Sequence, residues 1–257
     1  MKKQLRLAVL FAAALATTSA AQAKSVDDAI QLYERGEFSA SARMLLPLAD
    51  NGDAKAQFVL AVQYEKGEGV ERDLARAASW YKKSAELGYV KSQYNLARAY
   101  ANGHGVAKDE AMAAHWYRKA VDQGLPIAFT NLGTLYAQGR GVPQSDVKAF
   151  QLYQEAAYFG EPIAIRLYGV AFLEGKGVEQ DYGRALRVLK VAADEGNADA
   201  YQDMARIYRH GLGVEADWER YKALLREGAA KGAKGARLEL EIIEDVEGTV
   251  RQSGGVK

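Results

Sequence analysis

Residues 92–109 read SQYNLARAYANGHGVAKD, and the fold can be worked out from this stretch. Its motif Gly-x-Gly-Val starts at Gly103 and recurs with starts at 67, 139, 175 and 211, always 36 residues apart. A second series of glycines, at 52, 88, 124, 160, 196 and 232, keeps the same spacing. Two series without a slip indicate a tandem array in which each unit is one supersecondary element.

The residues before each Gly-x-Gly-Val loop predict a helix, which we name helix A. In the quoted stretch Ser92, Leu96, Ala97 and Tyr100 are small, large, small and aromatic, and the other units follow this order with few changes. These positions are separated as i, i+4, i+5 and i+8, so they lie on one face of a helix. Each helix A is therefore expected to bury that face.

A second helix, helix B, is predicted after each loop. The position just before it always holds a residue whose side chain can accept an unpaired backbone N–H. These cap residues are Asp73, Asp109, Ser145, Asp181 and Asp217. Each helix B ends at the second glycine series, as expected for a left-handed C-terminal cap. The loop glycines are also expected to be structural. They are Gly67, Gly69, Gly103, Gly105, Gly139, Gly141, Gly175, Gly177, Gly211 and Gly213.

One helix–loop–helix hairpin cannot bury its apolar face alone, so the units are expected to stack. We predict an all-α fold, a right-handed superhelical α-solenoid. Its five units are 53–88, 89–124, 125–160, 161–196 and 197–232. A shorter hairpin over 24–52 precedes them, and Pro47 should kink or shorten its second helix. A polar capping helix over 233–248 and a disordered tail over 249–257 follow.

The combined pattern Ala-x-x-x-Leu-Ala/Gly-x-x-Tyr-x-x-Gly-x-Gly-Val-x-x-Asp resembles Sel1-like repeats, which are relatives of tetratricopeptide repeats with a longer loop between the helices. The resemblance covers about residues 53–232. It implies a protein that binds other proteins, with helix A lining the concave surface. Some cysteine-rich members are linked to enzyme activity or penicillin binding. This chain has no cysteine, so those properties are not carried over.

The N-terminus predicts export. A basic start, Lys2-Lys3, precedes an apolar run at residues 7–16, and Ala21-Gln22-Ala23 matches the small-x-small cleavage pattern. We interpret residues 1–23 as a signal peptide cleaved after Ala23, because the apolar run is too short for a membrane anchor. The mature chain is then expected in a bacterial periplasm or outside the cell. No later stretch is apolar and long enough to span a membrane.

Composition and motifs argue against chemistry carried by the chain. Signal cleavage changes the formal net charge from +1 to −2, which does not favour nucleic-acid binding. The absence of cysteine removes thiol catalysis, disulfides and thiolate metal sites. His104, His115 and His210 lack a metal-ligand spacing, and the Gly-x-Gly loops follow a helix rather than a strand. We therefore expect no catalytic residue, no metal and no cofactor.

The predicted contact surface consists of two positions on each helix A, left over when residues such as Leu60 and Tyr64 are placed in the core. These contact positions hold Phe58, Val62, Tyr94, Arg98, Thr130, Thr134, Arg166, Val170, Gln202 and Arg206, with Arg209 one turn further on. They include arginines and no acidic residue, which suggests a groove with an apolar end and a basic end for a partner with acidic residues. The alternative is a solvated face whose charges pair with neighbours such as Glu65 or Asp199.

The resemblance implies an interaction protein of the periplasm. Exported Sel1-like proteins include envelope scaffolds, regulators that bind sensors, and immunity proteins against secreted toxins. The expected partner is thus a toxin, a sensor or an envelope assembly component, and the neighbouring genes would distinguish these roles. One alternative is an enzyme acting on cell-wall or β-lactam substrates, which would need converging polar groups that the sequence lacks. Another is a small-molecule binding module, but aromatic residues at helical spacing are more often core.

Overall fold

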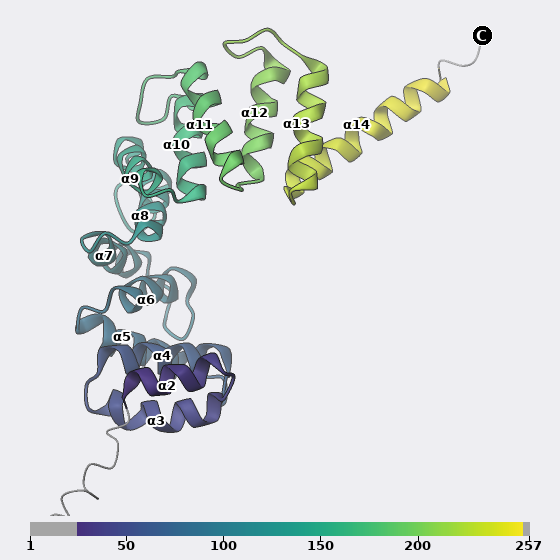
Figure 1. Ribbon diagram of the computed structural model, residues 1–257. Helices are drawn as coiled ribbons and strands as arrows, with labels where there is room; N and C mark the ends of the chain where they lie inside the picture. The colour runs from purple at the N-terminus through teal and green to yellow at the C-terminus, as the bar shows by residue number, and fades with distance from the viewer. Residues whose placement is uncertain (1–24, 254–257) are drawn as a thin grey trace, which may run out of the picture. The chain divides into compact units, whose positions relative to one another are not determined.

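The computed structural model describes residues 25–253, with side chains up to residue 247. This part of the chain contains thirteen helices and no strand, so the prediction of an all-α fold is confirmed (Figure 1). The predicted signal peptide and residues 254–257 lie outside the described residues.

The chain divides into two compact units, the first ending at Ala107 and the second beginning at Lys108. The helices of the N-terminal unit are α2 (Val26–Glu34), α3 (Phe38–Asp50), α4 (Ala54–Lys66), α5 (Leu74–Glu86) and α6 (Val90–Asn102). Those of the C-terminal unit are α7 (Glu110–Val121), α8 (Pro126–Gln138), α9 (Asp146–Tyr158), α10 (Pro162–Glu174), α11 (Tyr182–Asp194), α12 (Asp199–His210), α13 (Trp218–Ala230) and α14 (Lys234–Ser253). Helices α4, α6, α8, α10 and α12 are helices A, and the helix after each of them is a helix B.

Within each unit, every helix packs against the next one along the chain. The two helices of a hairpin contact each other, as in α4 with α5 or α10 with α11. Helix B of one hairpin also contacts helix A of the next, as in α5 with α6 or α9 with α10. Each unit is therefore a stack of hairpins, which makes the fold an all-α repeat solenoid.

Local chemistry explains where the helices begin and end. The helices B start at the five cap residues named above; at α7, for example, Oδ1 of Asp109 accepts the backbone N–H of Met112 at 2.9 Å. Each helix A ends at the first glycine of its loop, and Gly103 there has a φ of 74°. Because L side chains rarely adopt this left-handed conformation, glycine suits the position.

The second glycine of each loop is required for a different reason. A Cβ atom added to Gly105 would lie 1.9 Å from the carbonyl oxygen of Leu74, the first residue of α5. The loop of one repeat thus touches the start of helix B in the preceding repeat, and only a residue without a side chain fits. The same backbone collision would occur at Gly69, Gly141 and Gly177. This contact links neighbouring repeats and helps to explain why the motif recurs at one spacing.

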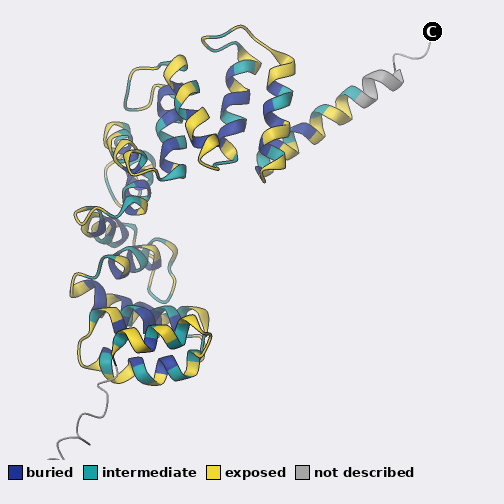
Figure 2. Cartoon of the chain, in the orientation of Figure 1, coloured by how far each residue is buried: buried dark blue, intermediate teal, exposed yellow. Residues whose placement is uncertain are grey.

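Small and aromatic side chains fill the space between the helices. Alanines such as Ala56, Ala97 and Ala128 are fully buried where helices approach most closely. Tyr81 and Tyr117 are buried between the helices as larger filling residues. Figure 2 shows buried and exposed stripes alternating around the helices, as expected for amphipathic elements that stack.

At the ends of the array, two helices continue past residues at which the sequence predicted a disturbed helix or a tail. Helix α3 is not shortened by Pro47 but continues to Asp50, because a proline near the end of a helix removes one hydrogen bond while Leu45 and Ala49 stay buried across it. Helix α14 continues to Ser253, into the segment predicted to be a disordered tail. A single glycine, Gly248, interrupts no helix by itself, since it costs only about 1 kcal/mol.

Helix α14 also differs from the polar cap that the sequence predicted. Its side chains Leu238, Ile242 and Val246 follow one another at intervals of four and form an exposed apolar stripe. The acidic residues that suggested a polar cap occupy other sides of the helix, and Glu239 contacts Gln202, Arg209 and Tyr221.

Candidate functional site

In the N-terminal unit, the predicted contact residues are two aromatic, one aliphatic and one basic. Phe58, Val62 and Tyr94 are half-buried on α4 and α6, whereas Arg98 is exposed. The Arg98 guanidinium lies over the Tyr94 ring, 5.8 Å from its centroid, and its Nη1 is 3.5 Å from Oδ1 of Asn95. This is the cation–π arrangement, in which the charge stays accessible to a partner.

In the C-terminal unit, α8, α10 and α12 carry the remaining contact residues. Thr134, Arg166, Val170 and Gln202 are half-buried, and Arg206 and Arg209 are exposed. Thr130 is buried, and its hydroxyl donates a hydrogen bond of 2.9 Å to Oε2 of Glu161. A buried threonine with a satisfied hydroxyl contributes to packing rather than to direct contact.

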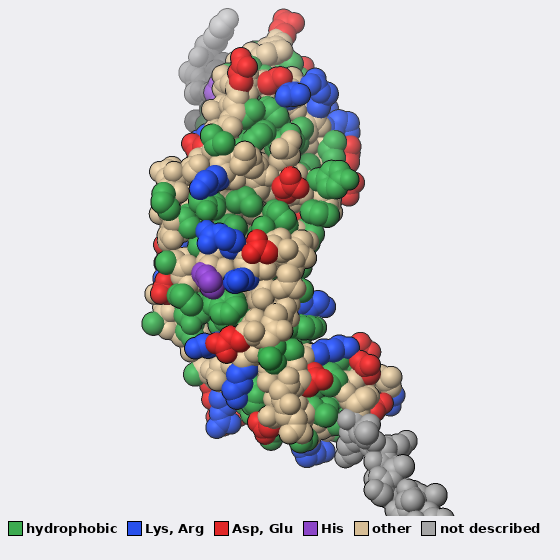
Figure 3. Space-filling view, turned by 90° about the vertical axis from the view of Figure 1, so that its left-hand side faces the viewer, with side chains coloured by type: hydrophobic (Ala, Val, Ile, Leu, Met, Phe, Trp, Pro, Cys, Tyr) green, Lys and Arg blue, Asp and Glu red, His purple; other side chains and the backbone are tan. Residues whose placement is uncertain are grey.

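Each arginine predicted at the basic end has a carboxylate partner. Nε of Arg166 lies 2.5 Å from Oδ2 of Asp203. Arg206 pairs with Glu174 at 3.1 Å, and Arg209 pairs with Glu239 at 3.0 Å. The positive charge of this end is therefore compensated within the chain. On the face drawn in Figure 3, acidic and basic side chains are likewise interspersed among hydrophobic ones.

These acids were not singled out from the sequence, which named Glu65 and Asp199 as neighbours. Glu65 instead accepts a 2.5 Å hydrogen bond from the Tyr81 hydroxyl. A regular spacing could have pointed to two of these acids. Asp203 lies 37 residues after Arg166, and Glu239 lies 37 residues after Gln202, which is one repeat plus one residue in both cases.

Burial and ion pairing shift the pKa values of three side chains near the predicted contact residues. Burial raises the pKa of Asp203 above its usual range, although the Arg166 charge acts in the opposite direction. Burial also acts to raise the pKa of Glu174, but hydrogen bonds from Lys176 and Arg206 hold it below its usual range. Burial, together with a hydrogen bond to Glu239, raises the pKa of Tyr221 to about 12.

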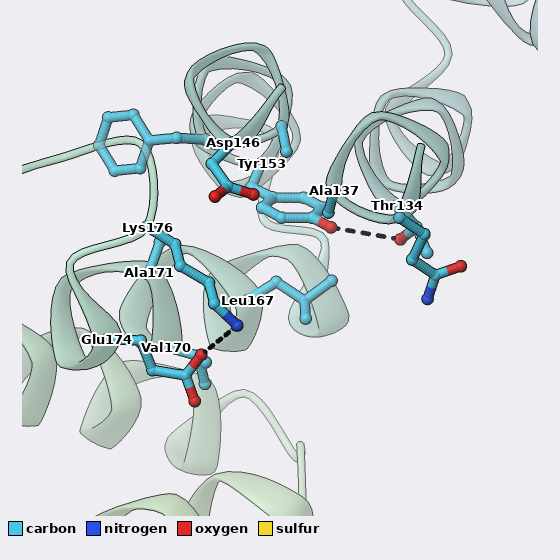
Figure 4. Close-up of a pocket in the computed structure, with 12 residues that line it drawn as sticks. Thr134, Ala137, Asp146, Tyr153, Leu167, Val170, Ala171, Glu174 and Lys176 are labelled. Carbon is cyan, nitrogen blue, oxygen red and sulfur yellow. Dashed lines mark hydrogen bonds and ion pairs between the residues drawn. The ribbon is translucent and has the colours of Figure 1, made fainter. Parts of the chain in front are cut away.

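The C-terminal unit contains a hollow of about 290 Å³ between α8, α9 and α10, which we call the α8–α10 hollow (Figure 4). Two predicted contact residues, Thr134 and Val170, line it. Its other lining residues are Ala137, Gln138, Asp146, Ala149, Phe150, Tyr153, Leu167, Ala171, Glu174 and Lys176. The sequence predicted a groove along the helices A but not this hollow.

Some polar side chains that line the α8–α10 hollow have a hydrogen-bond or ion-pair partner within the chain, and one does not. Nζ of Lys176 pairs with Oε2 of Glu174 at 2.7 Å, and the Tyr153 hydroxyl contacts Oγ1 of Thr134 at 3.4 Å. The half-buried carboxylate of Asp146 makes no hydrogen bond or ion pair with the rest of residues 25–247. Figure 4 shows Asp146 and Tyr153 across the hollow from the Lys176–Glu174 pair. The lining residues carry one more negative than positive charge.

A metal-binding cluster and a membrane-spanning helix were both sought among the described residues. Among residues 25–253, no group of three or more histidine, aspartate or glutamate side chains is placed to hold a metal ion. In the same part of the chain, no helix combines the length and the apolar composition needed to cross a bilayer.

The stacked hairpins, the 36-residue period and the glycine-capped loops define a protein built from α-helical hairpin repeats. The chain belongs to the Sel1 repeat family, whose repeat matches residues 54–89, 90–125, 127–158, 162–197 and 198–224. Sel1 repeat proteins are protein-interaction modules, and the fold typically serves as an interaction scaffold rather than as a catalyst.

Solved structures show the same fold. A Sel1 repeat protein from Oxalobacter formigenes is 30% identical, with a TM-score of 0.80 over 85% of this chain and 87% of that one. The c5321 protein, a protective antigen of uropathogenic Escherichia coli, is 29% identical with a TM-score of 0.73. That match covers 84% of this chain and 47% of c5321.

A third structure is the immunity protein Pa5087 from Pseudomonas aeruginosa. It is 25% identical and has a TM-score of 0.48 over 71% of this chain and 67% of that one. This similarity is too low to carry the role of Pa5087 over to this protein. No curated protein matched the chain significantly.

Proposed function

We propose that this chain is exported to the bacterial periplasm and acts there by binding a partner protein on its helix-A face. The observation that supports this most directly is the α8–α10 hollow, because two residues chosen as contact residues, Thr134 and Val170, form part of its wall. A folded core leaves few voids larger than a water molecule, so an open hollow on a repeat surface is suited to receive part of another molecule.

The proposed action is contact rather than catalysis. The partner is an envelope assembly component, a sensor or a secreted toxin, which makes the chain a scaffold, a regulator or an immunity protein. These roles differ in what lies beside the gene. A toxin gene next to it favours immunity, and polysaccharide or sensor-kinase genes favour the other two roles.

The partner can be sought by cross-linked affinity purification of the tagged protein from its native periplasm. Arg98→Glu and Val62→Glu change the helix-A face at positions without an ion pair in residues 25–247, so the fold should be retained. Lys119→Glu, on the exposed side of α7, is the matched control. We expect the control to retain the cross-linked partner and the two face variants to lose it. Equal recovery with all three would show that another surface binds.

Export has its own test, which does not depend on the partner. We expect the protein from the periplasmic fraction to begin at Lys24, which Edman sequencing or intact mass would reveal. A full-length chain that stays in the cytoplasm would contradict the assignment of residues 1–23 as a cleaved signal peptide.

A further inference from the structure

We propose that the α8–α10 hollow is an anchor pocket for an arginine side chain of the partner protein. This inference rests on the proposed function, in which the helix-A face binds a protein. It goes further by naming the place on that face, the residue that enters it and the group that holds the charge. The argument uses the size of the hollow, its walls, its charge and a comparison with the equivalent place in another repeat.

The size of the hollow suits one long side chain. Its volume is about 290 Å³, at the lower limit of pockets that bind drug-sized molecules. It is open to solvent, and two residues of the predicted contact surface, Thr134 and Val170, line it. A side chain that projects from a bound partner could therefore enter without any movement of the helices.

The walls are suited to an aliphatic stem with a planar tip. Leu167 and Val170 supply apolar surface on α10, and the small Ala137 opens the side formed by α8. Phe150 and Tyr153 add aromatic rings from α9. Long cationic side chains bury their methylene groups on such surfaces, and a guanidinium stacks on aromatic rings more readily than an ammonium does.

The charges favour a cation. The Lys176 ammonium is held by Glu174, so it offers little attraction to an anion. The Asp146 carboxylate forms no hydrogen bond or ion pair within residues 25–247, and the Lys176 charge that acts on it is already paired with Glu174. A guanidinium can form two parallel hydrogen bonds with one carboxylate, which are stronger and more specific than neutral hydrogen bonds. An incoming carboxylate would instead be repelled by Asp146.

The N-terminal unit contains an equivalent hollow, made by the residues 72 positions earlier. It lies between α4, α5 and α6, but its volume is only about 20 Å³. Glu65 and Arg98 occupy the positions of Ala137 and Val170, and they reduce the open space beside Tyr81. The N-terminal unit thus fills with its own side chains, Glu65 and Arg98, the place that the C-terminal unit leaves open.

The next repeat closes the same place in another way. Leu173 and Leu189 stand at the positions of Ala137 and Tyr153, and both are almost fully buried. Filling by leucine, or by a glutamate and an arginine from neighbouring helices, is therefore compatible with the repeat geometry. The open, acidic form at α8–α10 results from specific residues and is not a general property of the hairpin stack.

The test uses the mature full-length protein and short capped peptides as probes. The three peptides have alanine on both sides of a central arginine, a central citrulline or a central lysine. Citrulline has nearly the shape of arginine but no charge. Binding is followed by two-dimensional amide NMR, with the chemical shifts of Thr134, Ala137 and Ala171 as reporters. The amides of Glu65 and Ala99, at the filled hollow, serve as an internal reference.

We expect the arginine peptide to cause saturable shifts at the three reporter amides and not at the reference amides. The citrulline peptide should bind at least about tenfold more weakly, and the lysine peptide should bind more weakly than the arginine peptide. Added salt should weaken the arginine complex, because the Asp146 contact is electrostatic. Equal binding of arginine and citrulline, or no saturable shift up to the solubility limit, would overturn the proposal.

Variants assign the binding to the proposed atoms. Asp146→Asn should bring arginine affinity down to that of citrulline. Ala137→Leu introduces the residue that position 173 already carries, so it should fold and abolish binding by filling the hollow. Glu155→Gln, an exposed carboxylate half a turn around α9 from Asp146, is the matched control and should change nothing. If Asp146→Asn bound the arginine peptide as tightly as the wild type, the charge assignment would be wrong.

The two proposals can fail separately. If the peptides bind as expected but the purified protein captures nothing through its helix-A face, the anchor pocket remains and the proposed function is wrong. If Arg98→Glu and Val62→Glu abolish capture while the peptides do not bind, the helix-A face acts without an arginine anchor and the pocket proposal is wrong.

Discussion

The ion pair between Arg166 and Asp203 allows a stringent test of how this repeat array is stabilised. The two side chains are 27% and 13% exposed, and they join helix A of one repeat to helix A of the next. Replacing Arg166 with threonine, the residue at the equivalent position 130, leaves the Asp203 carboxylate largely buried and without its partner. We expect this change to be costly, since an uncompensated buried charge destabilises the folded state.

The size of the effect follows from the burial of the pair. Breaking a buried ion pair costs about 3–5 kcal/mol, and partial exposure of Arg166 places this case near the lower end, at about 3 kcal/mol at neutral pH. In the double variant Arg166→Thr, Asp203→Leu, position 203 carries the residue found at position 167. Replacing a buried pair with apolar side chains is often neutral or stabilising, so the double variant should unfold with a free energy close to that of the wild type.

The direction in which pH changes the cost of Arg166→Thr follows from the pKa of Asp203. Burial already raises the folded-state pKa of Asp203 above the ordinary value of 3.8, and removing Arg166 should raise it further. Between the ordinary value and the raised value, the folded state binds more protons than the unfolded state. The stability contributed by this group is therefore present in acid and lost as pH rises through the folded-state pKa. The cost of Arg166→Thr should shrink as the pH is lowered through this window.

The assay is urea unfolding followed by circular dichroism at several pH values, with the slope m compared between variants. An unchanged m is needed, because repeat arrays can unfold in parts. A loss below about 1 kcal/mol at neutral pH would mean that solvent satisfies Asp203 and that the pair is an ordinary surface contact. A loss that does not vary with pH would refute the protonation argument.

Further predictions concern the loops, the caps and one tyrosine. Gly88→Ala places alanine at a positive φ without meeting a neighbouring atom, and it should cost about 1 kcal/mol of folding free energy. Gly105→Ala combines a positive φ with a collision against the backbone of Leu74, so it should cost roughly 3 kcal/mol or more. Urea unfolding of both variants measures the difference. Asp109→Ala removes a helix cap and should cost about 1 kcal/mol by the same measurement. Glu239→Gln should lower the pKa of Tyr221 from about 12, as read from tyrosinate absorbance; an unchanged value would contradict the hydrogen-bond argument. With the pKa raised from 10.0, stability from Tyr221 should be lost as pH rises from 10.0 to about 12.

The fold was predictable because its signals are local. A cap residue such as Asp109 marks the start of a helix through one hydrogen bond to a backbone N–H three residues away. A glycine such as Gly103 marks the end through its own φ. Neither signal requires knowledge of the neighbouring repeat. At Pro47 and Gly248 the helices continue, because there burial or a low intrinsic cost outweighs the helix-breaking tendency of the residue.

The charge balance of the contact face was less predictable because it depends on contacts between repeats. The sequence shows that Arg166 faces outward on its own helix, but not which residue of the next helix lies opposite. The offset of 37 residues to Asp203 reflects how neighbouring helices A are displaced in the stack. The sequence-based alternative was correct in kind, since the charges pair with neighbours, but it named Asp199, which lies one turn earlier on α12.

The α8–α10 hollow was not predicted for a related reason. Its volume depends on side chains from three helices at once, and Ala137 looks like an ordinary small residue of an alanine-rich repeat. Only comparison with the equivalent positions shows the difference, because glutamate at 65 and leucine at 173 fill the space that Ala137 leaves open. A comparison of equivalent positions in the sequence does not single these residues out, because the preceding repeat also carries an alanine, Ala101, and an acidic residue, Glu110, at the positions of Ala137 and Asp146.

This contrast indicates where specificity arises in such an array. The positions that keep the period, such as Gly105 and Asp109, are needed by every hairpin, so they cannot distinguish one partner from another. Specific recognition must come from positions that the stack leaves free to vary, and the residues that fill the junction between hairpins are among them. Because leucine, or the side chains of Glu65 and Arg98, fill this junction elsewhere, an array can open or close a binding pocket by one or two substitutions without changing its backbone. On this argument Ala137→Leu should remove binding at the α8–α10 hollow while leaving the free energy of unfolding equal or higher, and a large loss of stability would show that the hollow is part of the fold rather than a site placed on it.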